Sequence, residues 1–143
     1  MSNFISLLAT ALLLSTPNLA LACSIFPAEP REVFETSDSL VLAHPTEISP
    51  TPEEAKQLQW HYSYQQIVTW KVDKSWKGSL TDGETFVTEW RINSRDPCSG
   101  WGLIRDYQPK ILRSVAGSSF QLYIAAPVDW AAPQLDALKE AHD

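Results

Sequence analysis

The longest regular pattern in the chain is an alternation of apolar and polar residues between Trp60 and Trp76. Alternation at every second residue places the apolar side chains on one face of an extended strand. The residues of that face are Tyr62, Tyr64, Val68, Trp70, Val72 and Trp76, with Ile67 out of phase. The pattern predicts one long amphipathic strand that is curved or bulged.

Shorter apolar runs predict four further strands, at 40–43, 84–92, 110–115 and 118–125. The first ends before Pro45, and the last two flank Gly117 in the manner of a hairpin. The stretch from Pro45 to Gln57 carries three prolines and three glutamates. We expect it to be a projecting loop with a helical turn at 52–55.

Two segments have helical character. Pro30 suits the first turn of a helix over 29–36, with Val33 and Phe34 as its apolar face. The segment 133–142 predicts a terminal helix whose Leu135 and Leu138 point inward. Five antiparallel strands in a chain this short close most easily as a small barrel. We therefore predict a mainly β fold, a five-stranded barrel of the oligonucleotide/oligosaccharide-binding (OB) type with a helix at each end.

The amino terminus has the features of an export signal. Residues 1–22 contain no charged side chain, and the apolar run from Phe4 to Leu14 is too short to span a bilayer. Ala20 and Ala22 form the A-x-A pattern of a signal-peptidase site. We expect residues 1–22 to be removed and 23–143 to form one domain that is secreted or periplasmic, with no transmembrane segment.

Cleavage there would make Cys23 the first residue of the mature chain. In one interpretation its thiol is lipidated, although Ala20 and Leu21 match the lipoprotein signal poorly. In the other it forms a disulfide with Cys98, as an even number of cysteines in an exported chain suggests. A crosslink closing about 75 residues would stabilise the fold by about 4–5 kcal/mol on the loop-entropy argument. We favour the disulfide and keep the lipid anchor as the alternative.

Charge and motifs narrow the functional classes. The chain has 11 Lys and Arg against 17 Asp and Glu, a net charge of −6, which argues against binding nucleic acid. Its histidines, at positions 44, 61 and 142, are scattered, and we find no metal-binding or catalytic motif. We therefore predict no cofactor, no metal of its own and no enzymatic activity. Lys71, Lys74 and Lys77 fit an ordinary strand edge.

An amino-terminal cysteine has chemistry of its own. A free α-amino group has a pKa near 8, so part of the population is uncharged at neutral pH. Its nitrogen and the carbonyl oxygen of the same residue can form a five-membered chelate with one metal ion. Such a terminus could occupy the open coordination position of a catalytic zinc in another protein.

Three stretches carry a family resemblance: Cys23-Ser24-Ile25-Phe26-Pro27, the segment 30–34 (PREVF) and Asp38-Ser39-Leu40-Val41. Together they resemble the mature amino terminus of the tissue inhibitors of metalloproteinases (TIMPs), which reads C-[ST]-C-x-P, then P-Q-Q-A-F, then D-V-V. The segment 71–78 (KVDKSWKG) is similar to a strand end of the same family and of its short bacterial relatives. Cys98-Ser99-Gly100 is similar to the C-G that accepts the disulfide from the first cysteine. In order, the resemblance covers residues 23 to about 125.

The resemblance implies a netrin-like OB barrel that inhibits a zinc metalloprotease. It implies that Cys23 chelates the protease zinc, that Cys98 tethers Cys23, and that the residues after Cys23 contact the target. These contact residues are Ser24, Ile25, Phe26 and Pro27. Ile25 and Glu35 stand where the family has cysteines, so two family disulfides are absent, and the inhibitors' second domain is missing.

Three functional hypotheses follow. The first is an exported TIMP-like module that binds, and through Cys23 inhibits, a zinc metalloprotease. The second is a netrin-like module that binds partners in the cell envelope or outside the cell, with or without a lipid on Cys23, and does not inhibit. The third, a small hydrolase, has no motif in its favour.

Overall fold

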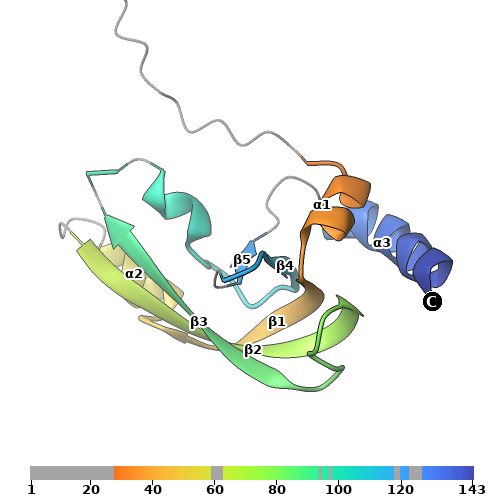
Figure 1. Cartoon of the computed structure of the whole chain (residues 1–143). Helices are drawn as coiled ribbons and strands as arrows, with labels where there is room; N and C mark the ends of the chain where they lie inside the picture. Colours follow the sequence, from red (N-terminus) through yellow and green to blue (C-terminus); the bar gives the residue numbers. More distant parts are fainter. Residues whose placement is uncertain (1–27, 59–62, 94, 97, 118–119, 123–126) are drawn as a thin grey trace, which may run out of the picture.

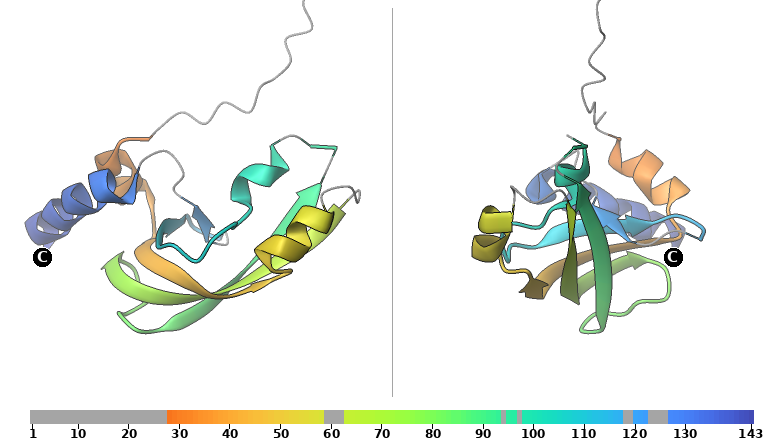
Figure 2. Two further views of the ribbon diagram at one scale, coloured as in Figure 1. Left: turned by 180° about the vertical axis from the view of Figure 1, so that it is seen from behind. Right: turned by 90° about the vertical axis from the view of Figure 1, so that its left-hand side faces the viewer.

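A computed structural model describes residues 28–58, 63–93, 95–96, 98–117, 120–122 and 127–143. These residues form a strongly curled antiparallel sheet, with helices α1 (Pro30–Thr36) and α3 (Val128–His142) at one end and α2 (Pro52–Leu58) at the other. The three views agree that α1 and α3 lie beside each other and far from α2 (Figures 1 and 2). Within the described segments, no helix is long and apolar enough to cross a membrane.

Four strands form most of the sheet, in the order β3-β2-β1-β4, with the two-residue β5 beside β4. Their bounds are β1 Ser39–Ser49, β2 Ser63–Lys77, β3 Thr85–Asn93 and β4 Lys110–Ser114. Three consecutive strands followed by a fourth that returns beside the first is the Greek-key arrangement. The two-residue segment β5 (Gln121–Leu122) pairs with β4. The prediction of a mainly β chain with a helix near each end is confirmed, whereas no described pairing joins β3 to β5 to close a barrel.

Strand β2 follows the predicted alternation. Its even-numbered residues Val68, Trp70, Val72 and Trp76 are buried, and Ile67 is exposed on the other face, as its phase indicated. The strand runs for 15 residues and pairs with β1 on one side and β3 on the other. Lys71 pairs with both neighbouring strands, so its assignment to a strand edge was wrong, whereas Lys74 and Lys77 lie beyond the end of β3 and pair with β1 alone.

Strand β1 is longer than predicted and continues through Pro45 to Ser49. Three register shifts interrupt its pairing with β2, one of them between Pro45 and Glu47. Bulges are where a strand tolerates proline, which has no N–H to donate to a neighbour. The stretch predicted as a loop from Pro45 to Gln57 is therefore half strand and half helix.

Helix α2 begins with a capping box that the sequence analysis did not use. The Thr51 N–H donates to Glu54 Oε2 (2.8 Å), and the Glu54 N–H donates to Thr51 Oγ1 (3.3 Å). The bond from the Thr51 N–H, and a second one that the Thr51 hydroxyl donates to Glu54 Oε2 (3.0 Å), hold the pKa of the Glu54 carboxyl below its usual value. The helix therefore extends well beyond the single turn predicted at 52–55.

Helix α3 begins at Val128, five residues before the predicted start, and contains Pro133. Burial of Ala131 and Leu135 against the rest of the molecule offsets the hydrogen bond that a proline lacks. The predicted orientation of Leu135 is confirmed, since this side chain is fully buried, while Leu138 is partly buried.

The buried apolar residues form two clusters, one on each side of β1. One lies between the sheet and the helix pair, and its members are Val33, Phe34, Leu40, Trp76, Ile111, Ala131 and Leu135. The other lies inside the curl of the sheet, and its members are Val41, Ala43, Ile48, Val68, Trp70, Val72, Ile104 and Leu112. Neighbouring residues Leu40 and Val41 belong to different clusters, so this part of β1 is buried on both faces.

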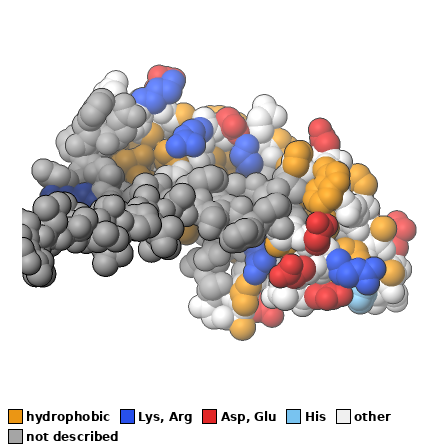
Figure 3. All heavy atoms as spheres, turned by 90° about the horizontal axis from the view of Figure 1, so that it is seen from above, with side chains coloured by type: hydrophobic (Ala, Val, Ile, Leu, Met, Phe, Trp, Pro, Cys, Tyr) orange, Lys and Arg blue, Asp and Glu red, His pale blue; other side chains and the backbone are white. Residues whose placement is uncertain are grey.

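Lysines of β2 attach the two helices to the sheet. Lys74 pairs with Asp136 of α3 (Nζ to Oδ1, 2.6 Å), and Lys77 donates to the carbonyl oxygen of Phe34 in α1 (2.9 Å). Trp76 also donates its indole N–H to Asp136 (2.6 Å). Charges of both signs are interspersed at this end of the molecule (Figure 3).

Candidate functional site

Most residues of the predicted site lie outside the described residues. These are the chelating Cys23 and the four expected target-contact residues Ser24, Ile25, Phe26 and Pro27. The predicted cleavage after residue 22 falls in the same undescribed segment, as does the Cys23 half of the predicted disulfide. Cys98 is the one predicted site residue that the structure places.

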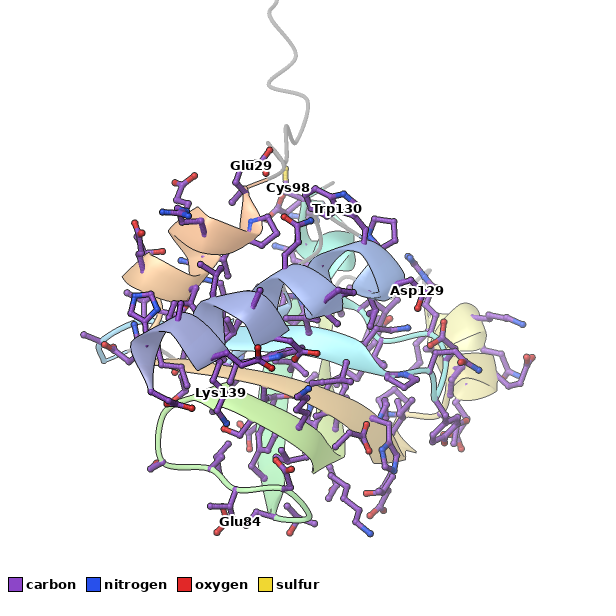
Figure 4. All side chains as sticks on the ribbon, turned by 90° about the vertical axis from the view of Figure 1, so that its right-hand side faces the viewer. Glu29, Glu84, Cys98, Asp129, Trp130 and Lys139 are labelled. Atoms are coloured by element: carbon purple, nitrogen blue, oxygen red, sulfur yellow. The ribbon has the colours of Figure 1, made fainter. Side chains whose placement is uncertain are left out.

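Cys98 lies directly after β3, at the N-cap of the short 3₁₀ helix η1 (Ser99–Gly102). Its backbone N–H donates to Asp96 Oδ1 (2.9 Å), and the residue is exposed. In Figure 4, Cys98 and Glu29 both lie at the upper edge of the molecule, the edge at which the chain enters α1. No cysteine within the described segments is free.

Ser99 fixes the turn that carries Cys98. Its hydroxyl oxygen accepts a hydrogen bond from the Asn93 N–H (2.9 Å) and lies within donating distance of the Asn93 and Asp96 carbonyl oxygens. The Ser99 carbonyl oxygen accepts the indole N–H of Trp90 (2.7 Å). Because Ser99 is buried, water competes little for these bonds, and the turn is held to the end of β3.

Gly102 allows η1 to approach the sheet closely. A Cβ atom at this position would fall onto the indole ring of Trp90, whereas one at Gly100 would meet no atom within 4 Å. Only glycine therefore fits at position 102 without displacing Trp90. The same indole thus contacts η1 through its ring and hydrogen-bonds to it through its N–H.

A buried glutamine fastens the far end of this loop. Gln66 of β2 is 0% exposed, and both ends of its amide group bind Ile104. The Gln66 Nε2 donates to the Ile104 carbonyl oxygen (2.9 Å), and Gln66 Oε1 accepts the Ile104 N–H (2.8 Å). The described residues that follow Cys98 are therefore bonded to the sheet at Ser99 and at Ile104.

Gln66 is not evident from the sequence because a polar residue at an even position of β2 looks like a break in the apolar face. Its even position is nevertheless informative, since it places Gln66 on the inner face with Val68 and Trp70. A buried amide must find hydrogen-bond partners. Nothing local indicates that those partners are 38 residues away.

A histidine and an aspartate lie close together away from the Cys98 loop. His44 Nδ1 and Asp73 Oδ1 are 2.8 Å apart across β1 and β2, with about a third of each side chain exposed. His142, at the end of α3, packs its ring against Phe34. The third histidine, His61, lies outside the described residues. Searching the described residues finds no group of three or more His, Cys, Asp or Glu that could hold a metal ion.

Comparisons of the chain with protein families, with curated proteins and with solved structures found no match.

Proposed function

We propose that this chain is an exported protein-binding module of the TIMP-like or netrin-like kind, whose first mature residue, Cys23, binds the catalytic zinc of a partner metalloprotease. The amino nitrogen and carbonyl oxygen of Cys23 would chelate the zinc, and a disulfide to Cys98 would hold both donors in place. Ser24, Ile25, Phe26 and Pro27 would contact the partner on either side of the metal.

The observation that carries the proposal is the hydrogen bonding that holds Cys98 and Ser99 beside the end of β3. A chelating terminus gains affinity when its geometry is fixed before binding, because less conformational entropy is lost in the complex. Ser99, the residue after Cys98, is bonded to Trp90 and Asn93 of β3, and Ile104 further along is bonded to Gln66 of β2. These bonds would restrain a residue tethered to the Cys98 sulfur.

The strand order also supports the proposal. An OB fold is a five-stranded, partly open Greek-key barrel. The order β3-β2-β1-β4, extended by β5 beside β4, is the order expected of such a barrel opened between β3 and β5. Closure of that gap is part of the proposal.

The decisive experiment changes the position of the amino group and nothing else. We would purify the exported protein, confirm by intact mass that it begins at Cys23, and measure inhibition of a panel of zinc metalloproteases. One alanine inserted before Cys23 should weaken inhibition at least 100-fold, equivalent to about 2.7 kcal/mol, because the amine is displaced from the metal. One alanine added after Asp143 is the matched control and should have no effect.

The outcomes separate the competing hypotheses. Equal inhibition by both extended variants would exclude chelation. A diacylglyceryl mass on Cys23, together with no inhibition by the wild-type protein, would favour the envelope-binding module instead. A mature protein that retains residues 1–22 would contradict both.

A further inference from the structure

A second candidate site lies at the end of the sheet remote from α1 and α3. A cavity of about 330 Å³ opens between α2, the ends of β2 and β3 where Tyr64 and Ile92 lie, and the segment 100–105. Figure 2 shows α2 beside these strand ends. Most of the lining is apolar, from Pro52, Ala55, Ile92, Leu103 and Ile104.

The cavity is formed by elements that are already held in place. Ile104 is bonded to Gln66 through both its N–H and its carbonyl oxygen. Helix α2 has its capping box at Thr51 and Glu54. Ala55, Ile92 and Ile104 are all less than 10% exposed, so their side chains have little freedom to close the space. Preformed, mainly apolar cavities with a few polar groups are typical of small-molecule sites.

The polar groups at the cavity favour an anion. Arg105 lines it, and within the described part of the chain its guanidinium makes no hydrogen bond or ion pair. Tyr64 lines it as well, and burial raises the pKa of its phenol, so the hydroxyl stays protonated and can donate. Lys56 and Glu53 also line it, but they pair with each other at 2.6 Å, so Arg105 is the cation left for an anion. In Figure 3, basic and acidic side chains lie beside apolar surface at the end of the molecule opposite α3.

We propose that this cavity binds a small amphipathic carboxylate, of the class of a medium-chain fatty acid. Its carboxylate would pair with Arg105 and accept the Tyr64 hydroxyl, and its apolar body would lie against Ala55, Ile92 and Leu103. At about 30 Å³ for each water-sized atom, 330 Å³ holds about eleven non-hydrogen atoms. Octanoate, with ten, is a fitting probe. The site is independent of Cys23 and of the function proposed above.

The first test compares three probes of the same length. Octanoate, 1-octanol and octylammonium would be titrated into the purified protein and followed by calorimetry and by amide shifts. Octanoate should bind saturably at one site, 1-octanol should bind at least 10-fold more weakly, and octylammonium should not bind. No saturable octanoate binding, or equal binding of the alcohol, would overturn the proposal.

The second test uses variants of the two parts of the site. Arg105→Gln should weaken octanoate at least 10-fold and leave 1-octanol unchanged. Arg91→Gln is the matched control, because Arg91 is exposed on the face of β3 opposite to Ile92, and it should bind as wild type does. Ala55→Leu should fill the cavity and abolish binding of both octanoate and 1-octanol, with circular dichroism confirming the fold.

Equal affinities in Arg105→Gln and Arg91→Gln would overturn the assignment of the anion to Arg105. A peptide with an apolar carboxyl-terminal residue that binds when octanoate does not would show a protein-binding pocket instead.

Discussion

Gln66 is the side chain on which the geometry of the Cys98 loop most depends. It is fully buried and supplies both hydrogen bonds that hold Ile104 to β2. A buried amide group that loses its partner is costly because water does not replace it. The residue therefore links the core of the sheet to the proposed tether.

Replacing Gln66 tests that link. Gln66→Leu keeps the size of the side chain but leaves the Ile104 N–H and carbonyl oxygen without partners, so we expect the free energy of unfolding to fall by about 2–4 kcal/mol. Gln65→Leu is the control, because Gln65 is exposed and bonded only to Glu89, and it should change stability by less than about 0.5 kcal/mol. Denaturant unfolding measures both, and equal effects would show that the buried amide has no special role.

Two glycines of η1 offer a sharper comparison. Gly102→Ala would push a methyl group onto the Trp90 indole, and overpacking of this kind costs about 1–3 kcal/mol. Gly100→Ala meets no atom and should be nearly neutral. Thermal unfolding gives the stabilities, and near-ultraviolet circular dichroism reports on Trp90. A Gly102→Ala variant as stable as Gly100→Ala would mean that η1 can move away from the sheet.

The positions of single residues, in the core and around the candidate site, were only partly predictable from the sequence. Alternation placed Trp70 and Val72 correctly, because burial of a strand face leaves a local, periodic signature. Gln66 and Gly102 leave no such signature, since their roles depend on Ile104 and Trp90, which approach them only in the folded chain.

At the scale of elements, helix α3 is attached to the sheet by a polar contact as well as by its buried apolar residues. Asp136 accepts hydrogen bonds from Lys74 and Trp76 of β2. The hydrogen bond from Lys74 has the largest effect and that from Trp76 the next largest, and together they hold the pKa of the Asp136 carboxyl below its ordinary value of 3.8. A carboxyl whose pKa is lowered by folding stabilises the folded state above the unfolded-state pKa.

The attachment of α3 should therefore weaken in acid. At pH 7, Asp136→Asn should lower the free energy of unfolding by about 0.5–1 kcal/mol, a modest value because the pair is partly exposed. The difference from wild type should begin to shrink as the pH falls below the unfolded-state pKa of about 4, and should be lost as the pH falls through the lower pKa of the folded carboxyl. Unfolding curves at pH 7 and pH 3 measure it. Glu140→Gln removes the same charge at an exposed position of the same helix, and its free energy of unfolding should stay within about 0.5 kcal/mol of wild type. If Asp136→Asn lowered the free energy of unfolding equally at both pH values, the contact of Asp136 with β2 would not be the cause.

Elements with a clear alternation of apolar and polar residues were predicted well, but the residues at which elements begin and end were predicted less well. Strand β2 was recognised from alternation, and of the hairpin predicted around Gly117 the described residues show the pairing of β4 with Gln121 and Leu122. The end of β1 and the start of α3 were misjudged because Pro45 and Pro133 were treated as boundaries. In both elements, pairing or packing with distant parts of the chain outweighs the local cost of the proline.

At the scale of the whole molecule, the proposed tether from Cys23 to Cys98 should dominate stability. If it forms, reduction should lower the free energy of unfolding by about 4–5 kcal/mol on the loop-entropy argument. Cys98→Ser should match the reduced wild-type protein and should not respond to reductant. Denaturant unfolding with and without dithiothreitol measures this, and a wild-type protein indifferent to reductant would refute the tether.

Much of the fold class was predictable from the sequence, whereas the geometry of the proposed site was not. A mainly β chain with terminal helices follows from short apolar runs and two helical segments, whose signals are local. The proposed site includes an amino-terminal segment whose role would depend on processing and on a partner, and neither leaves a periodic signal in the sequence. Its one described residue, Cys98, lies at the N-cap of η1, in the loop that follows β3.

Strand β1 separates the two hydrophobic clusters yet contributes residues to both, through Leu40 on one side and Val41 on the other. Neither half of the molecule can then keep its interior dry after β1 leaves the sheet. Amide protons of residues 40–43 should consequently be among the slowest to exchange with deuterated solvent, and protection in the helix pair and in the curled half should disappear in a single cooperative event.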